Sequence, residues 1–135
     1  MGPRIVILAD DLIWSTRLIA AVRAAGAEPV AVRTAQALDA ALAGGSAGGI
    51  GHAIVDLTAR AYDGIDAIAA AVAADASVLA VGQHDDIALR KRAFAAGAAR
   101  VLAYRKLADD GPGAIRTWLE RATPRASATA EARAR

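Results

Sequence analysis

Three aspartates stand at the ends of two short apolar runs. Asp56 closes the run 53–56, and Asp10 and Asp11 follow the run 5–8. The carboxyl ends of the strands in an open parallel sheet border the crevice in which ligands bind. If both runs are strands that end side by side, the three aspartates share one pocket. Carboxylates in such a pocket can bind a divalent cation, and one of them can act as a nucleophile.

Short apolar runs alternate with amphipathic segments along the chain, and this alternation predicts the fold class. The expected strands are residues 5–8, 29–32, 53–56, 77–81 and 101–104. The expected helices are residues 12–25, 35–43, 65–74, a segment from Asp85 or Asp86 to Gly97, and a last one after residue 113. Such alternation indicates an α/β fold with a parallel sheet covered by helices on both faces. Five strands then give a doubly wound, flavodoxin-like three-layer sandwich in the order 2-1-3-4-5, in which Asp10 faces Asp56.

The helical spacing of apolar residues indicates which side chains face the sheet. In the first helix we expect Leu12 and Trp14 to face inward, and in the third helix Val72. Near the C-terminus Trp118 shares a helical face with Ile115, so we expect it to complete the core. An exposed Trp118 would instead mark a partner interface, because aromatic residues anchor such contacts.

Length and composition indicate one folded domain with a tail. The chain has 135 residues, of which 56% are hydrophobic and 4% aromatic, so aliphatic side chains must build the core. Residues 123–135 are rich in alanine and arginine and have no apolar stripe. We therefore expect a domain over residues 1–122 and a disordered tail over 123–135. The absence of cysteine excludes disulfides and thiolate metal sites.

Charge and hydropathy argue against nucleic-acid and membrane partners. The sequence pI is about 9.5, but residues 121–135 hold four arginines and one glutamate. Because the whole chain carries +2, residues 1–120 carry a net charge of −1. A nucleic-acid-binding domain normally has its positive charge on the folded face, so we expect no specific nucleic acid. No apolar run approaches the ~20 residues of a membrane span and no secretory signal is recognisable, so we expect no membrane contact and a cytoplasmic protein.

Two other patterns are not expected to form sites. The glycine-rich segment 44–51 lacks the lysine of a phosphate-binding loop and precedes a strand, so we expect a plain flexible connection. The two histidines, His52 and His84, fall at opposite ends of different expected strands. A histidine-based metal or catalytic pair is therefore not expected.

The third expected strand and the loop after it resemble the CheY-like receiver domains of bacterial response regulators. Asp56 is followed by Asp63 and Gly64 seven and eight residues later, as in the receiver pattern D-x-x-x-P-x-x-D-G. The segment 95–98, Ala-Ala-Gly-Ala, is also typical, and the resemblance covers about residues 4–122. It implies that Asp56 corresponds to the phosphoacceptor and that an acidic pair at the end of the first strand binds Mg²⁺.

The metal-binding acids depart from the receiver pattern. Aligned backwards from Gly26, the acidic pair falls on Ala9 and Asp10, with Asp11 as the candidate substitute for the missing acid. Asp10 and Asp11 also suit a helix start, because carboxylates stabilise helix N-termini. Helix capping and weak Mg²⁺ binding by Asp10, Asp11 and Asp56 are compatible, and both remain open. Three carboxylates this close are also expected to repel one another.

The switch positions depart further. Gly82 stands where receivers have a hydroxyl residue, Tyr104 where they have a lysine, and Val101 where they have an aromatic residue. Arg60 replaces the proline of the loop after the phosphoacceptor. A phosphoryl group on Asp56 would lack the hydroxyl and the cation that compensate its charge. The sequence therefore favours a degenerate, pseudo-receiver form and leaves a working phosphoacceptor as the alternative.

We interpret the chain as a stand-alone receiver-like signalling module that acts through protein–protein contacts and is not an enzyme. Its partner would be another signalling protein, such as a kinase, regulator or effector, and the chain itself a monomer or weak homodimer. Tyr104, Arg105 and Trp118 are the candidate contact residues. The first alternative is a response regulator that is phosphorylated on Asp56 with Mg²⁺ bound.

Two rival classes are less well matched. A small aspartate-nucleophile phosphatase or phosphotransferase would resemble Asp-x-Asp on the first strand, whereas residues 9–11 are Ala-Asp-Asp. A flavodoxin-like binder of small ligands would place a phosphate loop after the first strand. The two acids found there would repel a phosphate, which argues against flavin.

Overall fold

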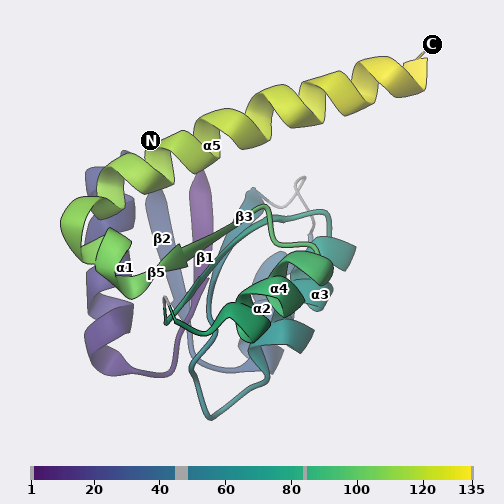
Figure 1. The fold of residues 1–135 in the computed structure, drawn as a ribbon. Coiled ribbons are helices and arrows are strands. Elements are labelled where there is room, and N and C mark those ends of the chain that lie inside the picture. The colour runs from purple at the N-terminus through teal and green to yellow at the C-terminus, as the bar shows by residue number, and fades with distance from the viewer. Residues whose placement is uncertain (1, 45–48, 84, 135) are drawn as a thin grey trace.

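Five parallel strands form one sheet in the predicted order β2-β1-β3-β4-β5 (Figure 1). The computed structural model describes residues 2–44, 49–83 and 85–134, with side chains as far as residue 121. The strands are β1 (Arg4–Leu8), β2 (Glu28–Val32), β3 (Ile50–Asp56), β4 (Ser77–Gly82) and β5 (Arg100–Ala103). Leu8 of β1 pairs with Val55 of β3, so these strands end side by side and the acidic residues after them meet at one edge of the sheet.

A helix follows each strand, and four of the five helices begin at a capping side chain. The helices are α1 (Leu12–Ala24), α2 (Ala35–Leu42), α3 (Gly64–Ala73), α4 (Ile87–Ala95) and α5 (Tyr104–Ala134). The caps of α1 to α4 are Asp11, Thr34, Asp63 and Asp86, whose side chains each accept a hydrogen bond from a backbone N–H of the first turn. Such a bond satisfies one of the N–H groups that a helix start leaves unpaired. Capping residues in the sequence therefore mark where these four helices begin.

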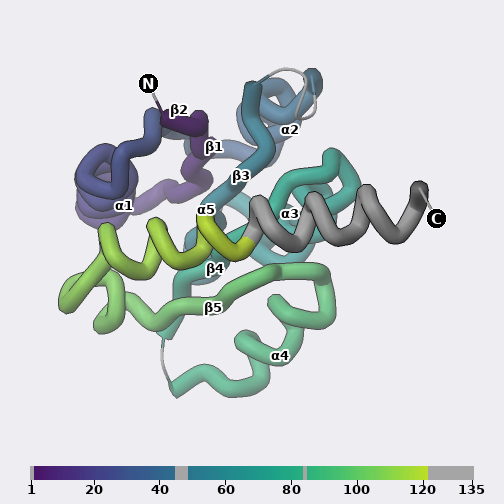
Figure 2. The backbone as a smooth tube through the Cα atoms, turned by 90° about the horizontal axis from the view of Figure 1, so that it is seen from above, coloured from purple at the N-terminus to yellow at the C-terminus, as the bar shows by residue number. Residues whose placement is uncertain are grey.

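The helices cover both faces of the sheet and give three layers (Figures 1 and 2). Side chains alternate between the faces along each strand. In β1, Ile5 and Ile7 therefore pack with the side chains of α1 and α5, while Val6 and Leu8 pack with those of α2, α3 and α4. Two aliphatic core layers result, and they hold the ends of β1 and β3 in place.

The C-terminal part of the fold differs from the sequence-based expectation. β5 ends at Ala103, and Tyr104 begins α5 instead of ending the strand. Within α5 the backbone breaks at Asp110 (φ −156°, ψ 61°), whose carboxylate accepts a hydrogen bond of 3.1 Å from the N–H of Gly113. We predicted only the helix after this break. Tyr104 and Leu107, both packed against the α1 side of the core, have a helical spacing of three residues, but one such pair is too short a pattern to predict a helix.

Two side chains predicted to face inward are exposed. Leu12 is 74% exposed because the buried face of α1 is formed by Leu18, Ala21 and Val22. At 100° per residue, Leu12 lies about 120° around the helix from Leu18 and so falls outside this face. Val72 is 37% exposed, since it lies at the rim of the α3 face and not at its centre.

Trp118 is buried, so the prediction that it belongs to a contact surface is wrong and the core interpretation is confirmed. Its side chain is 1% exposed, and its Nε1–H donates a hydrogen bond of 3.0 Å to Ser77 Oγ. The ring packs edge-on against His52, with 5.2 Å between ring centroids and an interplanar angle of 87°. Within the described part of the chain, His52 Nε2 is buried without a hydrogen-bond partner. Burial lowers the pKa of His52, because an imidazolium ion would lose its hydration there.

The lowered pKa of His52 predicts a loss of stability in mild acid. The unfolded chain takes up this proton more readily than the folded one. Stability should therefore be complete above the ordinary histidine value of 6.5 and fall as the pH drops from there toward the lowered pKa of the folded protein. The urea midpoint should be lower at about pH 5.5 than at about pH 7.5, the range in which histidine titrates. His52→Phe, which keeps a ring against Trp118, should reduce this difference.

His84→Gln serves as the control for the other histidine, and it should leave the pH dependence unchanged. An equal loss in mild acid for the wild type and His52→Phe would show that another group is responsible.

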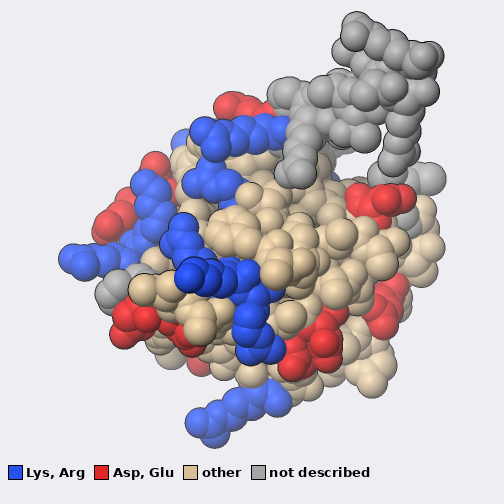
Figure 3. All heavy atoms as spheres, turned by 45° about the vertical axis from the view of Figure 1, so that its right-hand side comes forward, with Lys and Arg blue, Asp and Glu red and all other residues tan. Residues whose placement is uncertain are grey.

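Several sequence-based expectations fall outside what the structure describes. Residues 45–48 of the glycine-rich segment and His84 lie outside the described residues, and so do the side chains of 122–135. The domain boundary at residue 122 and the disorder of 123–135 remain predictions. No helix of the described part is both long enough and apolar enough to cross a bilayer. On the face drawn in Figure 3, lysine and arginine side chains form a band that acidic side chains border, so both signs of charge reach this surface.

Candidate functional site

The carboxyl ends of the central strands border an open pocket of about 450 Å³. Asp10, Asp11 and Asp56 all line it, as the strand order predicts. The other lining residues are Trp14, Thr58, Arg60, Gln83 and Tyr104. Asp56, the last residue of β3, is only 1% exposed. The structure therefore brings the three aspartates together around a buried carboxylate.

Hydrogen bonds from two neighbours converge on one oxygen of Asp56. Its Oδ1 accepts bonds from the N–H of Thr58 (3.1 Å) and from the Thr58 hydroxyl (3.0 Å). The Tyr104 hydroxyl also donates to Oδ1 and lies against the Thr58 hydroxyl, so the two hydroxyls share one acceptor. Charged acceptors make shorter and stronger hydrogen bonds than neutral ones. Asp56 is thus bonded by two hydroxyls, and one of them belongs to Tyr104, the residue that the sequence resemblance aligns with the receiver lysine.

Asp10 and Asp11 each hold part of the backbone. Asp10 Oδ2 accepts hydrogen bonds from the N–H groups of Arg60 (3.0 Å) and Ala61 (2.9 Å), which ties the loop after β3 to the end of β1. Asp11 Oδ1 accepts from the N–H of Trp14 (2.9 Å) and caps α1. These bonds offset the mutual repulsion that we expected from the sequence, because each carboxylate has positively polarised N–H groups beside it.

The three aspartates do not form a metal site as a trio. Among the described residues, no group of three or more potential ligands comes close enough to hold a metal ion, so the predicted site of Asp10, Asp11 and Asp56 requires correction. Asp11 is used as the cap of α1. Asp10 and Asp56 remain, and in the described hydrogen bonds each accepts through one oxygen only. A carboxylate has two oxygens, and Mg²⁺ needs one or two carboxylates with waters, so Asp10 and Asp56 are the two residues that would hold the ion.

Tyr62 ties together the two strands that carry the site, and sequence reasoning missed it. Its hydroxyl lies 2.9 Å from the backbone oxygen of Leu8 and 2.6 Å from that of Asp56, and donates toward both. Burial, followed by the charges of Asp56 and Asp10, raises the pKa of Tyr62, so the phenol remains a donor. Tyr62 is the only aromatic residue between Asp56 and Gly64, which is the signal that singles it out in the sequence.

Removing the Tyr62 hydroxyl should destabilise the fold. Tyr62→Phe keeps the ring but leaves the backbone oxygens of Leu8 and Asp56 without this donor. We expect the free energy of unfolding to fall by about 1–3 kcal/mol, the usual cost of leaving a buried hydrogen-bonding group unpaired. Urea unfolding of the two proteins measures the difference. An unchanged midpoint would mean that water replaces the hydroxyl at no cost.

Tyr104 also connects the pocket to α1. Its ring stacks on Trp14 with 4.1 Å between centroids and an interplanar angle of 27°. The Arg17 guanidinium lies over the other ring of this pair, 5.0 Å from the centroid of Trp14. Burial raises the pKa of Tyr104, and the hydrogen bond to Asp56 adds to this. Tyr104 is half-buried with its hydroxyl bonded to Asp56, whereas Arg105 is exposed, and the contact role of both residues remains a prediction.

The remaining switch positions are packed without their receiver groups. Gly82 ends β4 next to Ala103 of β5, and Val101 is buried in the core layer under α4. The hollow that Gly82 and Val101 help to line has a volume of about 10 Å³, which is about the space of one water molecule. Its lining also includes Gln83, Asp86 and Arg90, so this side of the site has no hydroxyl or ring at positions 82 and 101 but is not wholly apolar.

No protein-family model and no curated protein matches this sequence, but solved structures match its fold. The signal receiver domain of a protein from Vibrio parahaemolyticus superposes with a TM-score of 0.74 at 18% identity, over 95% of this chain and 98% of that one. A response regulator receiver domain protein from Clostridium thermocellum gives 0.72 at 18% identity, over 88% and 95%. A response regulator protein from Burkholderia pseudomallei, with a phosphorylated aspartic acid, a calcium ion and citrate, gives 0.63 at 22% identity, over 76% and 59%.

At sequence identities this low, the structural similarity shows a shared fold and nothing more specific. The strand order 2-1-3-4-5 and the helices on both faces of the sheet agree with the fold of these neighbours. The chain has the receiver-domain fold of bacterial response regulators.

Proposed function

We propose that this chain is a pseudo-receiver, a signalling module that acts by binding another signalling protein and not as an enzyme. The observation that carries the proposal is the Tyr104 hydroxyl on the Asp56 carboxylate, where the receivers that it resembles have a lysine. A phenol has no full positive charge, and compensation of charge is most of what catalyses phosphoryl transfer. The Tyr104 hydroxyl therefore occupies the Asp56 carboxylate without compensating the charge of a phosphoryl group. We propose that the signal depends on the binding of a partner protein and not on phosphorylation.

In this proposal Mg²⁺ has a limited role. Asp10 and Asp56 would hold the ion, which would supply positive charge beside the acceptor, while Asp11 stays on the α1 cap. The Burkholderia pseudomallei neighbour contains a calcium ion together with a phosphorylated aspartic acid, which supports a divalent ion in this chain. With only two carboxylates available, we propose weak binding.

The partner in this proposal is a kinase, regulator or effector in the cytoplasm, and the chain is a monomer or weak homodimer without a nucleic-acid or membrane partner. Exposed Arg105 remains a candidate contact residue. The phosphatase alternative is not favoured, because the neighbouring structures are receiver domains and response regulators. A working phosphoacceptor is the second candidate, since Asp56 is present beside an open pocket.

Labelling with a small phosphoryl donor tests the proposal. The wild type, Asp56→Ala and Tyr104→Phe are incubated with acetyl phosphate and Mg²⁺, and incorporated phosphoryl groups are counted by intact-mass measurement. Tyr104→Phe is the matched variant, because it keeps the ring on Trp14 and removes only the hydroxyl. We expect little label on the wild type, more on Tyr104→Phe and none on Asp56→Ala.

Each other pattern has a defined meaning. Strong labelling of the wild type, equal to that of Tyr104→Phe and absent from Asp56→Ala, would show that the hydroxyl does not guard Asp56 and would favour the working phosphoacceptor. The same proteins then serve as baits in a pull-down. A partner that binds the wild type equally with and without acetyl phosphate supports a pseudo-receiver, while a partner that requires the donor and Asp56 overturns it.

A further inference from the structure

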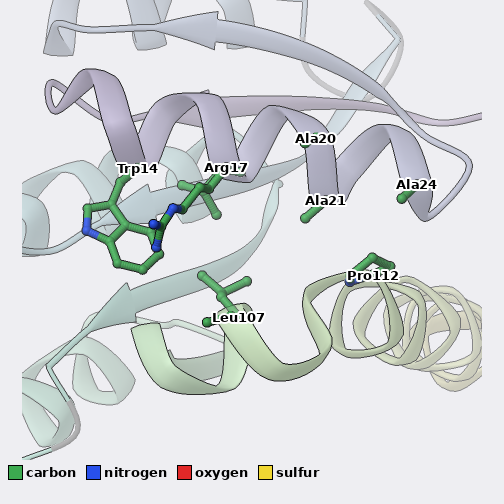
Figure 4. Close-up of a pocket in the computed structure, with 9 residues that line it drawn as sticks. Trp14, Arg17, Ala20, Ala21, Ala24, Leu107 and Pro112 are labelled. Carbon is green, nitrogen blue, oxygen red and sulfur yellow. The ribbon is translucent and has the colours of Figure 1, made fainter.

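A groove of about 570 Å³ lies between α1 and α5, on the other side of Trp14 from the acidic pocket. Its lining includes Trp14, Arg17, Ala21 and Ala24 from α1, and Leu107 and Pro112 from α5. Figure 4 shows the Trp14 ring and the Arg17 side chain at one end of the groove, with Leu107 pointing from α5 toward α1. Trp14 lines both cavities, so its ring is part of the wall between them.

An unbroken series of contacts leads from Asp56 to this groove. The Asp56 carboxylate accepts a hydrogen bond from the Tyr104 hydroxyl. The Tyr104 ring stacks on Trp14, and the Arg17 guanidinium lies over the Trp14 ring. The two rings belong to the first residue of α5 and the first turn of α1. Both helix starts therefore meet at a ring pair whose position depends on one hydrogen bond to Asp56.

We propose that the Tyr104–Trp14 ring pair transmits the state of the Asp56 carboxylate to the groove between α1 and α5. While Asp56 is free, it holds the Tyr104 hydroxyl and keeps the rings stacked. Any group that occupies the carboxylate competes with that hydroxyl and releases the ring pair. The proposal rests on the proposed function only in that the chain is a receiver-like module, and it holds for any group that occupies the Asp56 carboxylate, with or without phosphorylation.

The packing explains why the signal takes this direction. A ligand shifts a conformational equilibrium only through contacts that differ between the two states. Toward α4, Gly82 and Val101 offer neither a hydroxyl nor a ring to make such contacts. Toward α1, the Tyr104 hydroxyl is a contact that exists only while Asp56 is free. The ring pair is the element whose arrangement can then change.

Fluorine NMR of protein labelled with 5-fluorotryptophan tests the coupling without a phosphoryl donor, so its outcome is independent of the labelling experiment. The chain has two tryptophans, and Trp14→Phe assigns their resonances. Buried Trp118 reports that each variant is folded. We expect Asp56→Ala and Tyr104→Phe each to shift the Trp14 resonance by more than its line width, and to shift the backbone amides of Ala21, Ala24 and Leu107.

A background without the ring provides the decisive comparison. In Tyr104→Leu, adding Asp56→Ala should leave those groove amides unchanged, because the connection is already broken. Asp86→Ala, which removes the carboxylate that caps α4, is the matched control and should not shift the Trp14 resonance. The inference is overturned if Asp56→Ala does not shift the groove amides in the otherwise wild-type chain. It is also overturned if Asp56→Ala shifts them by the same amount in the Tyr104→Leu background as in the wild type. If the Trp118 resonance shows that Asp56→Ala is unfolded, the test uses Tyr104→Phe alone. The Trp14 resonance and the groove amides are then measured in that variant.

Discussion

Replacing Trp118 with alanine should lower the free energy of unfolding by about 3–5 kcal/mol, the usual cost of truncating a buried tryptophan. Trp118 is the largest of the fully buried side chains and packs in the core layer between the sheet and the helices α1 and α5. Its removal leaves a cavity and strips both the ring contact from His52 and the donor from Ser77. Since domains of this size are stable by only about 5–15 kcal/mol, the variant should lose a large share of its stability and unfold at a much lower urea concentration.

Urea unfolding with circular dichroism measures this loss, and two variants separate its parts. Trp118→Phe keeps most of the buried ring and should lose less than half as much stability. Ser77→Ala removes the acceptor of the indole N–H and should cost about 1 kcal/mol, the contribution of an ordinary hydrogen bond. Similar losses in Trp118→Ala and Trp118→Phe would show that the indole hydrogen bond, and not the packing, is what matters.

The fold could be predicted from the sequence because its signals are local and repeated. Each of the helices α1 to α4 follows a capping residue, and each strand contains a short aliphatic run. Together they specify a parallel sheet of five strands, and the connection rules then leave few topologies. The start of α5 was not predicted, because its apolar face consists of only two residues, Tyr104 and Leu107, before the break at Asp110.

The aspartates of the site could also be located, but the groups that surround them could not. Strand order alone brings Asp10 and Asp56 to one pocket. The partners of these acids come from loops and from a helix start, and sequence spacing says nothing about how far such side chains reach. Tyr62 and Thr58 went unnoticed for this reason, and Tyr104 was expected to leave Asp56 uncompensated.

The position of Tyr104 shows that a residue that departs from the family pattern can still bond the Asp56 carboxylate. As a strand residue, Tyr104 would have ended β5 at the edge of the sheet. As the first residue of α5, it places its hydroxyl on Asp56 and its ring on Trp14. A neutral donor thus stands in the place of the lysine, and it binds a free carboxylate without contributing a charge to a phosphoryl group.

Restoring the two receiver side chains, Gly82→Thr together with Tyr104→Lys, should raise the affinity of the pocket for beryllofluoride by at least about 100-fold. A hydrogen bond to a charged group contributes about 1.5–3 kcal/mol, and each 1.4 kcal/mol is a factor of about ten in affinity. Two restored contacts therefore give two or more factors of ten. The backbone has room for the change, because a Cβ at Gly82 would lie 3.4 Å from Leu57 Cδ1, an ordinary contact.

Titration with beryllium fluoride and Mg²⁺, followed by ¹⁹F and amide NMR, measures both the affinity and the reach of the response. Gly82→Val with Tyr104→Met is the matched control: valine has the shape of threonine without its hydroxyl, and methionine is an unbranched side chain without the charge of lysine. In the unaltered protein, amide shifts should occur around Asp10, Asp56 and Gly82 and be absent from Val101 and α4. Equal affinities of the restored and control pairs would show that the missing groups do not limit binding. Wide shifts at Val101 and α4 in the unaltered chain would overturn the pseudo-receiver interpretation, since they require a switch that works without a hydroxyl at position 82 or a cation at position 104.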